Sequence, residues 1–161
     1  MNIEIREIQE IDNVKLAGII RQTLKEFKAD KPGTVYYDES TDRLSELFQV
    51  AKSIYYVAVI NGELAGGAGI FPTEGLPADT VELVKMYLKP EARGLGLGKT
   101  LILKCIETAL ENGYSRIYLE TMAELGKAVQ TYIHLGFEQL TEPMGSSGHH
   151  SCEIWMLKDL K

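Results

Sequence analysis

Apolar and polar positions in the first fifty residues alternate with two different periods. Residues 3–8 alternate roughly between isoleucine and charged side chains, which predicts a first strand. Residues 11–27 carry apolar side chains at helical spacing, so they predict a helix with Asp12 or Asn13 as its cap. A second, short helix is predicted over residues 41–51. The apolar positions assigned to the buried face of the first helix are Ile11, Val14, Leu16, Ile19, Ile20, Leu24 and Phe27.

The centre of the chain is typical of a β-hairpin. Residues 54–60 are β-branched and aromatic, and Asn61-Gly62 follows them as a two-residue turn signal. The partner strand, residues 64–71, contains three glycines, which weaken it as a strand. Glycines in a strand favour a bulge or a close approach of another backbone.

The second half of the chain predicts strands that alternate with helices. A helix over residues 97–112 ends at Gly113, and its buried face is assigned to Leu97, Leu101, Cys105, Ala109 and Leu110. The other expected elements are strands at 80–88, 116–120, 137–140 and 153–157 and a helix at 124–135. This order predicts one mixed α/β layered domain over residues 1–161.

Composition narrows the classes of function. The chain has 161 residues, a net charge of -6 and a pI of about 5.1. We find no basic footprint for nucleic acid, no signal peptide and no apolar run that would span a membrane. The two cysteines, Cys105 and Cys152, are too few for a disulfide framework, so a reducing cytoplasm is the simplest compartment.

The most informative segment is a glycine run that follows a strand and opens a helix. Residues 93–100 read Arg-Gly-Leu-Gly-Leu-Gly-Lys-Thr. The first N–H groups of a helix have no partner within the helix and carry partial positive charge. Glycine lets these donors approach an anion without a Cβ in the way. The segment therefore has the chemistry of a pyrophosphate site.

The spacing of the glycines departs from the patterns of two common phosphate loops. A P-loop reads Gly-x-x-x-x-Gly-Lys-Thr, and residues 98–100 supply its end, but Arg93 stands in place of its first glycine. A dinucleotide fingerprint reads Gly-x-Gly-x-x-Gly. Counted from either starting glycine, the third glycine position holds Lys99 or Leu101.

A third pattern fits, together with two flanking motifs. Residues 93–98 resemble the Arg/Gln-x-x-Gly-x-Gly/Ala signature of the GNAT superfamily of acetyltransferases. Residues 82–90, Glu-Leu-Val-Lys-Met-Tyr-Leu-Lys-Pro, look like the fourth strand of that family, and residues 128–137 look like its Ala-x-x-x-Tyr-x-x-x-Gly-Phe ending. The resemblance implies a mostly antiparallel mixed sheet of about seven strands, splayed between the fourth and fifth strands and flanked by about four helices.

The resemblance also implies roles for individual residues. Acetyl-CoA would be the co-substrate and an amine the acceptor. The residues expected to bind acetyl-CoA are Met86, Tyr87, Leu88, Arg93, Gly94, Leu95, Gly96, Leu97, Gly98, Lys99 and Thr100. Tyr132 matches the tyrosine that protonates the departing thiolate, and Glu82 is a candidate general base. Leu125 stands where many relatives carry an asparagine that contacts pantetheine.

The acceptor side is less defined. Tyr36 and Tyr37 lie in the loop that lines the acceptor pocket in relatives, and His149 is expected at its edge. We expect no metal, because adjacent histidines seldom point at one ion. Polyamine, amino acid, antibiotic, peptide N-terminus and protein lysine all stay open as acceptors, and a small molecule is favoured.

Two other functions also stay open. One is a non-catalytic acyl-CoA sensor or binding module, which would keep the pyrophosphate loop without turnover. The other is a P-loop phosphotransferase. The resemblance leaves a homodimer open as well.

Overall fold

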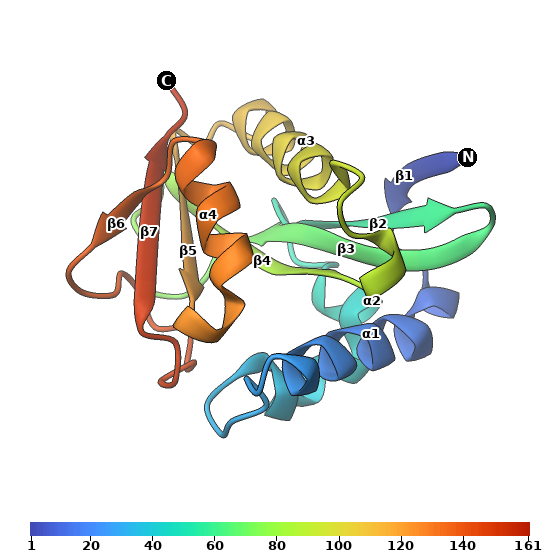
Figure 1. Cartoon of the computed structure of the whole chain (residues 1–161). Helices are drawn as coiled ribbons and strands as arrows, with labels where there is room; N and C mark the ends of the chain where they lie inside the picture. Colours follow the sequence, from blue (N-terminus) through green and yellow to red (C-terminus); the bar gives the residue numbers. More distant parts are fainter.

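One seven-stranded mixed sheet with helices on both faces makes up the protein (Figure 1). The computed structural model describes all residues, 1–161. The strands are β1 (Ile3–Glu7), β2 (Ile54–Ile60), β3 (Glu63–Phe71), β4 (Thr80–Leu88), β5 (Arg116–Thr121), β6 (Glu138–Leu140) and β7 (Ile154–Asp159). The helices are α1 (Asn13–Glu26), α2 (Leu44–Leu47), α3 (Leu97–Glu111) and α4 (Gly126–His134). The predicted fold class is confirmed.

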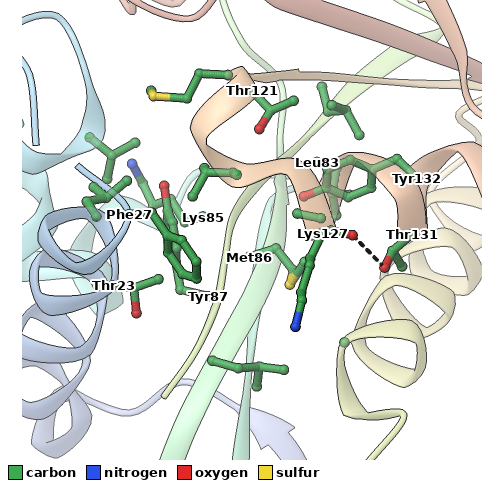
Figure 2. Close-up of a pocket in the computed structure, with 18 of the residues that line it drawn as sticks. Thr23, Phe27, Leu83, Lys85, Met86, Tyr87, Thr121, Lys127, Thr131 and Tyr132 are labelled. Carbon is green, nitrogen blue, oxygen red and sulfur yellow. Dashed lines mark hydrogen bonds between the residues drawn. The ribbon is translucent and has the colours of Figure 1, made fainter. Parts of the chain in front are cut away.

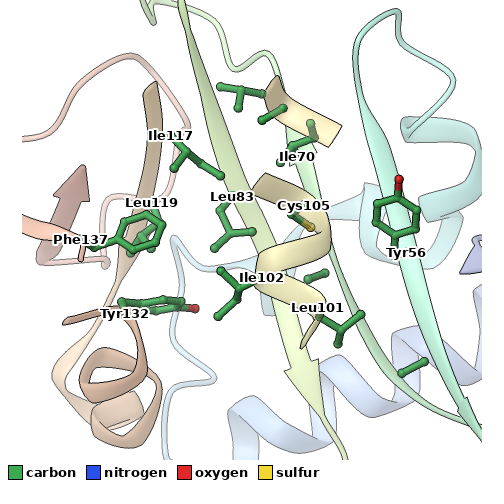
Figure 3. Packing of buried hydrophobic residues seen from close by; sticks show 14 of the residues in the cluster. Tyr56, Ile70, Leu83, Leu101, Ile102, Cys105, Ile117, Leu119, Tyr132 and Phe137 are labelled. Atoms are coloured by element: carbon green, nitrogen blue, oxygen red, sulfur yellow. The ribbon is translucent and has the colours of Figure 1, made fainter. Parts of the chain in front are cut away.

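The strand order in the sheet is β1-β2-β3-β4-β5-β7-β6, and only β4 and β5 run parallel. Helices α1 and α2 cover one face and α3 and α4 the other (Figure 1). Each face has its own apolar cluster: Leu16 and Leu24 of α1 belong to one, and Leu101 and Tyr132 to the other (Figure 3). None of the helices combines the length and apolar character that crossing a bilayer requires.

The sheet splits between its two parallel strands. Pairing between β4 and β5 is limited to Thr80, Val81 and Glu82 on β4, and the two strands separate after Glu82. Further along β4, Lys85 has a positive φ of 54° and the register with β3 shifts, which is a β-bulge. The split leaves the β5-facing edge of β4 without a neighbouring strand.

The β3 glycines allow the close approach that the sequence predicts. Gly66 has a φ of 150°, and a Cβ there would overlap the carbonyl oxygen of Tyr87 on β4. The register of β2 and β3 shifts at the same level, which confirms the predicted bulge. The Asn61-Gly62 turn is also confirmed, with both residues at positive φ as a tight hairpin needs.

Several details of the predicted helices are wrong. Ile11 and Val14 are 81% and 84% exposed, because the buried stripe of α1 begins only at Leu16. Leu110 is exposed too, and Ile102 takes the buried position on α3. The α-helical part of the second helix covers only Leu44–Leu47, after a 3₁₀ turn.

The two side chains predicted to cap α1 make hydrogen bonds outside this helix. Asp12 precedes α1, but its carboxylate accepts hydrogen bonds from the Arg6 guanidinium and from the Gln9 N–H. The Asn13 side-chain oxygen accepts the N–H of Ser45, at 2.9 Å. Asn13 thereby supplies an acceptor to the first turn of α2, so it joins two elements distant in sequence.

Candidate active site

The separation of β4 and β5 opens a cavity of about 790 Å³. Its walls come from the end of α1, from β4, from the glycine run, from β5 and from α4. Figure 2 shows Lys85 and Tyr87 on the α1 side and Lys127, Thr131 and Tyr132 on the α4 side. The cavity is therefore a slot between the two halves of the sheet, wide enough for a ligand of drug-like size.

The glycine run contains six consecutive backbone N–H groups that have no hydrogen-bond partner. Gly94 and Gly96 are left-handed, with φ of 77° and 75°, and α3 begins at Leu97. None of the backbone N–H groups of residues 94–99 donates a hydrogen bond to another protein group. No neighbouring atom lies within 4 Å of where a Cβ would stand on Gly94 or Gly96. This geometry suits a phosphate-bearing ligand.

Arg93 anchors the glycine run to α1. Its guanidinium donates to both carboxylate oxygens of Glu26, at 2.7 and 2.9 Å, and its Nε donates to the carbonyl of Leu88. It also lies over the Phe27 ring, 5.1 Å from the centroid. Of the residues predicted to bind acetyl-CoA, Leu95 and Thr100 do not line the cavity, and the others do.

Tyr132 points into the cavity from α4 (Figure 2). The residue is 7% exposed and packs edge-on against Phe137, with ring centroids 5.7 Å apart (Figure 3). Its hydroxyl makes no hydrogen bond within the protein, and burial raises the pKa of this phenol well above its ordinary value. Tyr132 therefore holds a proton at neutral pH and has a free donor in the cavity.

Glu82 is a buried carboxyl at the point where β4 and β5 separate. It is 4% exposed and lines the cavity, and the Thr73 hydroxyl donates to its Oε1 at 2.5 Å. Burial, with a contribution from the charge of Glu120, raises the pKa of Glu82 to about 7. The charges of His149 and Lys85 oppose this rise but do not cancel it. Glu82 can therefore take or release a proton near neutral pH.

A second carboxylate, Glu120 on β5, was not predicted from the sequence. It lines the cavity, and Tyr118 donates its hydroxyl hydrogen to Glu120 Oε2 at 2.7 Å. Ser147 donates to the other oxygen. Tyr118 and Glu120 share one face of β5 by strand periodicity, which is the only sequence signal that could have pointed to Glu120.

His149 and Lys85 also line the cavity. His149 Nε2 lies 2.7 Å from Asp38 Oδ2, and Lys85 Nζ lies 3.8 Å from the same oxygen. Burial raises the pKa of Asp38, but the hydrogen bond from His149 and the charges of His149 and Lys85 lower it more, so the net shift is downward. Asp38 is therefore a carboxylate at neutral pH.

The other predicted acceptor residues lie outside the cavity. Tyr36 and Tyr37 pack on each other, with ring centroids 5.1 Å apart, and Tyr37 is 61% exposed. Thr34 and Val35, just before them, line the cavity instead. Leu125 also lines it and gives that wall an apolar surface. The structure brings together no group of three His, Cys, Asp or Glu side chains that could hold a metal ion.

Comparisons with known proteins agree on one family. Residues 20–137 match the acetyltransferase (GNAT) family. The uncharacterized N-acetyltransferase YjgM of Escherichia coli is 43% identical over 151 residues, which cover 92% of this chain and 90% of that protein.

Solved structures share the fold over almost the whole chain. A GNAT-family acetyltransferase from Staphylococcus aureus superposes with a TM-score of 0.87 at 23% identity, covering 99% of this chain and 100% of that one. The PaiA N-acetyltransferase of Thermoplasma acidophilum, solved in complex with coenzyme A, gives a TM-score of 0.74 at 22% identity and covers 99% of each chain.

Proposed function

Because the chain belongs to the acetyltransferase (GNAT) family, we propose that it transfers the acetyl group of acetyl-CoA to the amine of a small molecule. Transfer occurs by direct attack while both substrates are bound. The observation that carries the proposal is the row of six unpaired N–H groups over residues 94–99, of which all but Leu95 line the cavity. The coenzyme A complex of the Thermoplasma acidophilum neighbour, which shares the fold, agrees with it.

Residues of the glycine run and of β4 would hold acetyl-CoA. The amides of residues 94–99 match the donors that a pyrophosphate needs. The pantetheine arm would lie in the slot beside Met86, Tyr87 and Leu88, where the β4 edge faces no strand. One N–H of this segment would donate to the acetyl oxygen as charge develops on it. The bound acetyl-CoA supplies the thioester, whose carbonyl carbon bonds to the amine nitrogen as the C–S bond breaks.

Glu82 would act as the general base. An amine attacks only through its neutral form, so an ammonium group first loses one proton, which passes to solvent. The nitrogen loses a second proton as the amide forms, and this proton balances the one that Tyr132 gives to sulfur. With a pKa of about 7, Glu82 is largely ionised just above neutral pH and still accepts that proton readily. Glu82 and Glu120 together offer a negatively charged end of the cavity to an incoming ammonium group.

Tyr132 would protonate the departing sulfur. Its phenol keeps its proton at neutral pH, and no protein group competes for that proton. Burial disfavours a thiolate and so raises the pKa of a thiol. In the same cavity, burial and the charges of Glu120, Glu82 and Asp38 raise the pKa of the Cys152 thiol to about 12. A thiolate formed there is a better proton acceptor than one in water.

Replacing Tyr132 with phenylalanine is therefore expected to lower kcat by at least about tenfold, because general-acid catalysis is lost. Acetyl-CoA affinity is expected to stay nearly unchanged, because the ring and its packing on Phe137 remain. Steady-state kinetics and isothermal titration measure the two effects. Tyr114→Phe is a matched control, since Tyr114 is buried in the same apolar cluster but does not line the cavity. An unchanged kcat in Tyr132→Phe removes this residue from the mechanism.

Two assays on the wild-type protein test the proposed function. Isothermal titration is expected to show acetyl-CoA binding at micromolar levels, and a thiol-release assay over an amine library is expected to show turnover. No detectable acetyl-CoA binding would end the proposal. Acetyl-CoA binding without turnover on any amine would favour a non-catalytic acyl-CoA module.

A further inference from the structure

Lys85 is a buried cation that the proposed reaction does not use. Its side chain is 6% exposed, yet it lines the cavity (Figure 2). Nζ makes no hydrogen bond, and its only ion-pair partner is Asp38 Oδ2 at 3.8 Å. That oxygen already contacts His149 at 2.7 Å. An ammonium group has three donors, so Lys85 brings unused hydrogen-bonding capacity into the cavity.

The backbone at Lys85 is in an unfavourable conformation. A φ of 54° is rare for a residue with a Cβ, because the Cβ then crowds the following carbonyl oxygen. The carbonyl of this residue accepts a hydrogen bond from the Tyr55 hydroxyl at 2.7 Å, which holds the bulge in place. Such conformations persist where the surrounding structure fixes them, and they concentrate at functional sites.

Charged groups of both signs line the cavity. Glu82 and Glu120 form an acidic end, and Lys85 forms a cationic position beside it. Burial lowers the pKa of Lys85, and the charges of Asp38 and Glu82 oppose this shift. Lys85 and Glu82 both belong to β4 and line the same cavity, so a small molecule could contact both.

We propose that Lys85 binds a carboxylate of the acceptor, so that the acceptor is an amino acid or a similarly small amino-carboxylate. The amine faces Glu82 and Glu120, while the carboxylate supplies the hydrogen-bond acceptors that Lys85 lacks. This inference rests on the proposed function and names the substrate class of the same site. A polyamine fits less well, because its second cation would meet a buried ammonium.

Matched pairs of acceptors test the inference on the wild-type protein. Each pair consists of an amino acid and the amine that remains when its carboxylate is removed, such as lysine and cadaverine or phenylalanine and phenethylamine. Thiol release is expected to give the amino acids at least a tenfold higher kcat/KM, because Lys85 adds a charge-assisted hydrogen bond to the carboxylate. Equal or better turnover of the decarboxylated amines overturns the inference while leaving the proposed function in place.

The Lys85→Met variant assigns the effect to this side chain. Methionine is unbranched and only one heavy atom shorter than lysine, and it removes the charge. The KM for the preferred amino acid is expected to rise at least about tenfold, and the KM for its decarboxylated partner to stay within about threefold. Lys104→Met makes the same change on the outer surface of α3, away from the cavity, and is expected to alter neither value. Equal KM changes for both members of a pair contradict carboxylate binding by Lys85.

Direct binding separates failure of this inference from failure of the proposed function. Isothermal titration of amino acids into the CoA-loaded protein is expected to show binding that Lys85→Met weakens. If amines are acetylated but no amino acid binds, the inference is wrong and the proposed function stands. If the protein does not bind acetyl-CoA, both are wrong.

Discussion

Replacing Gly96 with aspartate is expected to weaken acetyl-CoA binding by at least about 100-fold. The new carboxylate would stand among the six free N–H groups of residues 94–99, where it competes for the donors and repels the two phosphates. A hundredfold loss corresponds to about 2.7 kcal/mol, the size of a few lost charge-assisted hydrogen bonds. Isothermal titration measures the affinity.

The same variant is expected to stay folded. Aspartate tolerates the left-handed conformation better than most residues, and Gly96 has open space around it. A negative charge at the N-terminus of α3 is favourable by roughly 0.3–1 kcal/mol. This gain offsets part of the strain of a residue with a Cβ at the positive φ of Gly96. Thermal unfolding is therefore expected within a few degrees of wild type. Gly96→Asn has the same shape without the charge, so equal binding by the two variants would show that charge at the loop is unimportant.

Replacing Glu82 with glutamine is expected to lower kcat/KM by at least about 100-fold, because the general base is lost. In the wild type, activity requires the ionised carboxylate, so kcat/KM is expected to rise with pH up to about 7 and then level off. The variant, assayed with the same acceptor, is expected to lack this rise. The Thr73 hydroxyl, which bonds Glu82 Oε1, can donate to the glutamine oxygen, so the local structure is retained. Wild-type activity in this variant would exclude Glu82 as the base.

The Glu82→Gln variant is expected to lose activity but to gain stability at alkaline pH. Burial raises the pKa of Glu82 from 4.5 to about 7, so the folded protein binds this proton more tightly than the unfolded chain does. Stability from this group is present below pH 4.5 and is lost as the pH rises to 7. Glu82→Gln removes that loss, so at pH 8 its free energy of unfolding is expected to exceed wild type by roughly 1–3 kcal/mol. Urea unfolding at pH 5 and pH 8 measures the difference.

The sequence predicts the row of unpaired N–H groups in the glycine run well, because its signal is local. Three glycines alternate at the start of a helix, and the N–H groups that they leave bare belong to consecutive residues. The strand and helix order is also readable, since each element has its own period of apolar residues. The split between β4 and β5 followed from the family resemblance, and no single residue pattern indicates it.

The part of the cavity around Lys85, His149 and Glu120 is much less predictable, because it is assembled from distant segments. Asp38 and His149 are 111 residues apart and meet only in the folded chain. Lys85 lies in a bulge that interrupts the alternation of side chains along β4. The face of the sheet on which Lys85 lies therefore cannot be predicted from the two-residue period of a strand. Glu120 belongs to no recognisable sequence motif. It lines the cavity because β5 has separated from β4 at this point.

The errors in the helices have a related cause. Amphipathic spacing identifies α1, but it cannot tell that the sheet covers only the stripe from Leu16 onward and leaves Ile11 and Val14 in water. Asn13 stands where a cap of α1 is expected, yet it bonds Ser45 because the start of α2 lies beside it. Tertiary neighbours decide which hydrogen bond a capping side chain makes.

The central claim is that the bare amides of residues 94–99 bind the paired phosphates of acetyl-CoA. The most direct measurement is an NMR titration of the ¹⁵N-labelled protein with acetyl-CoA, compared with acetyl-pantetheine, which lacks those phosphates. We predict that acetyl-CoA shifts the six amide proton resonances of this segment downfield and in a saturable way, and that acetyl-pantetheine leaves them in place. Saturable acetyl-CoA binding that leaves these six resonances unmoved would contradict the account.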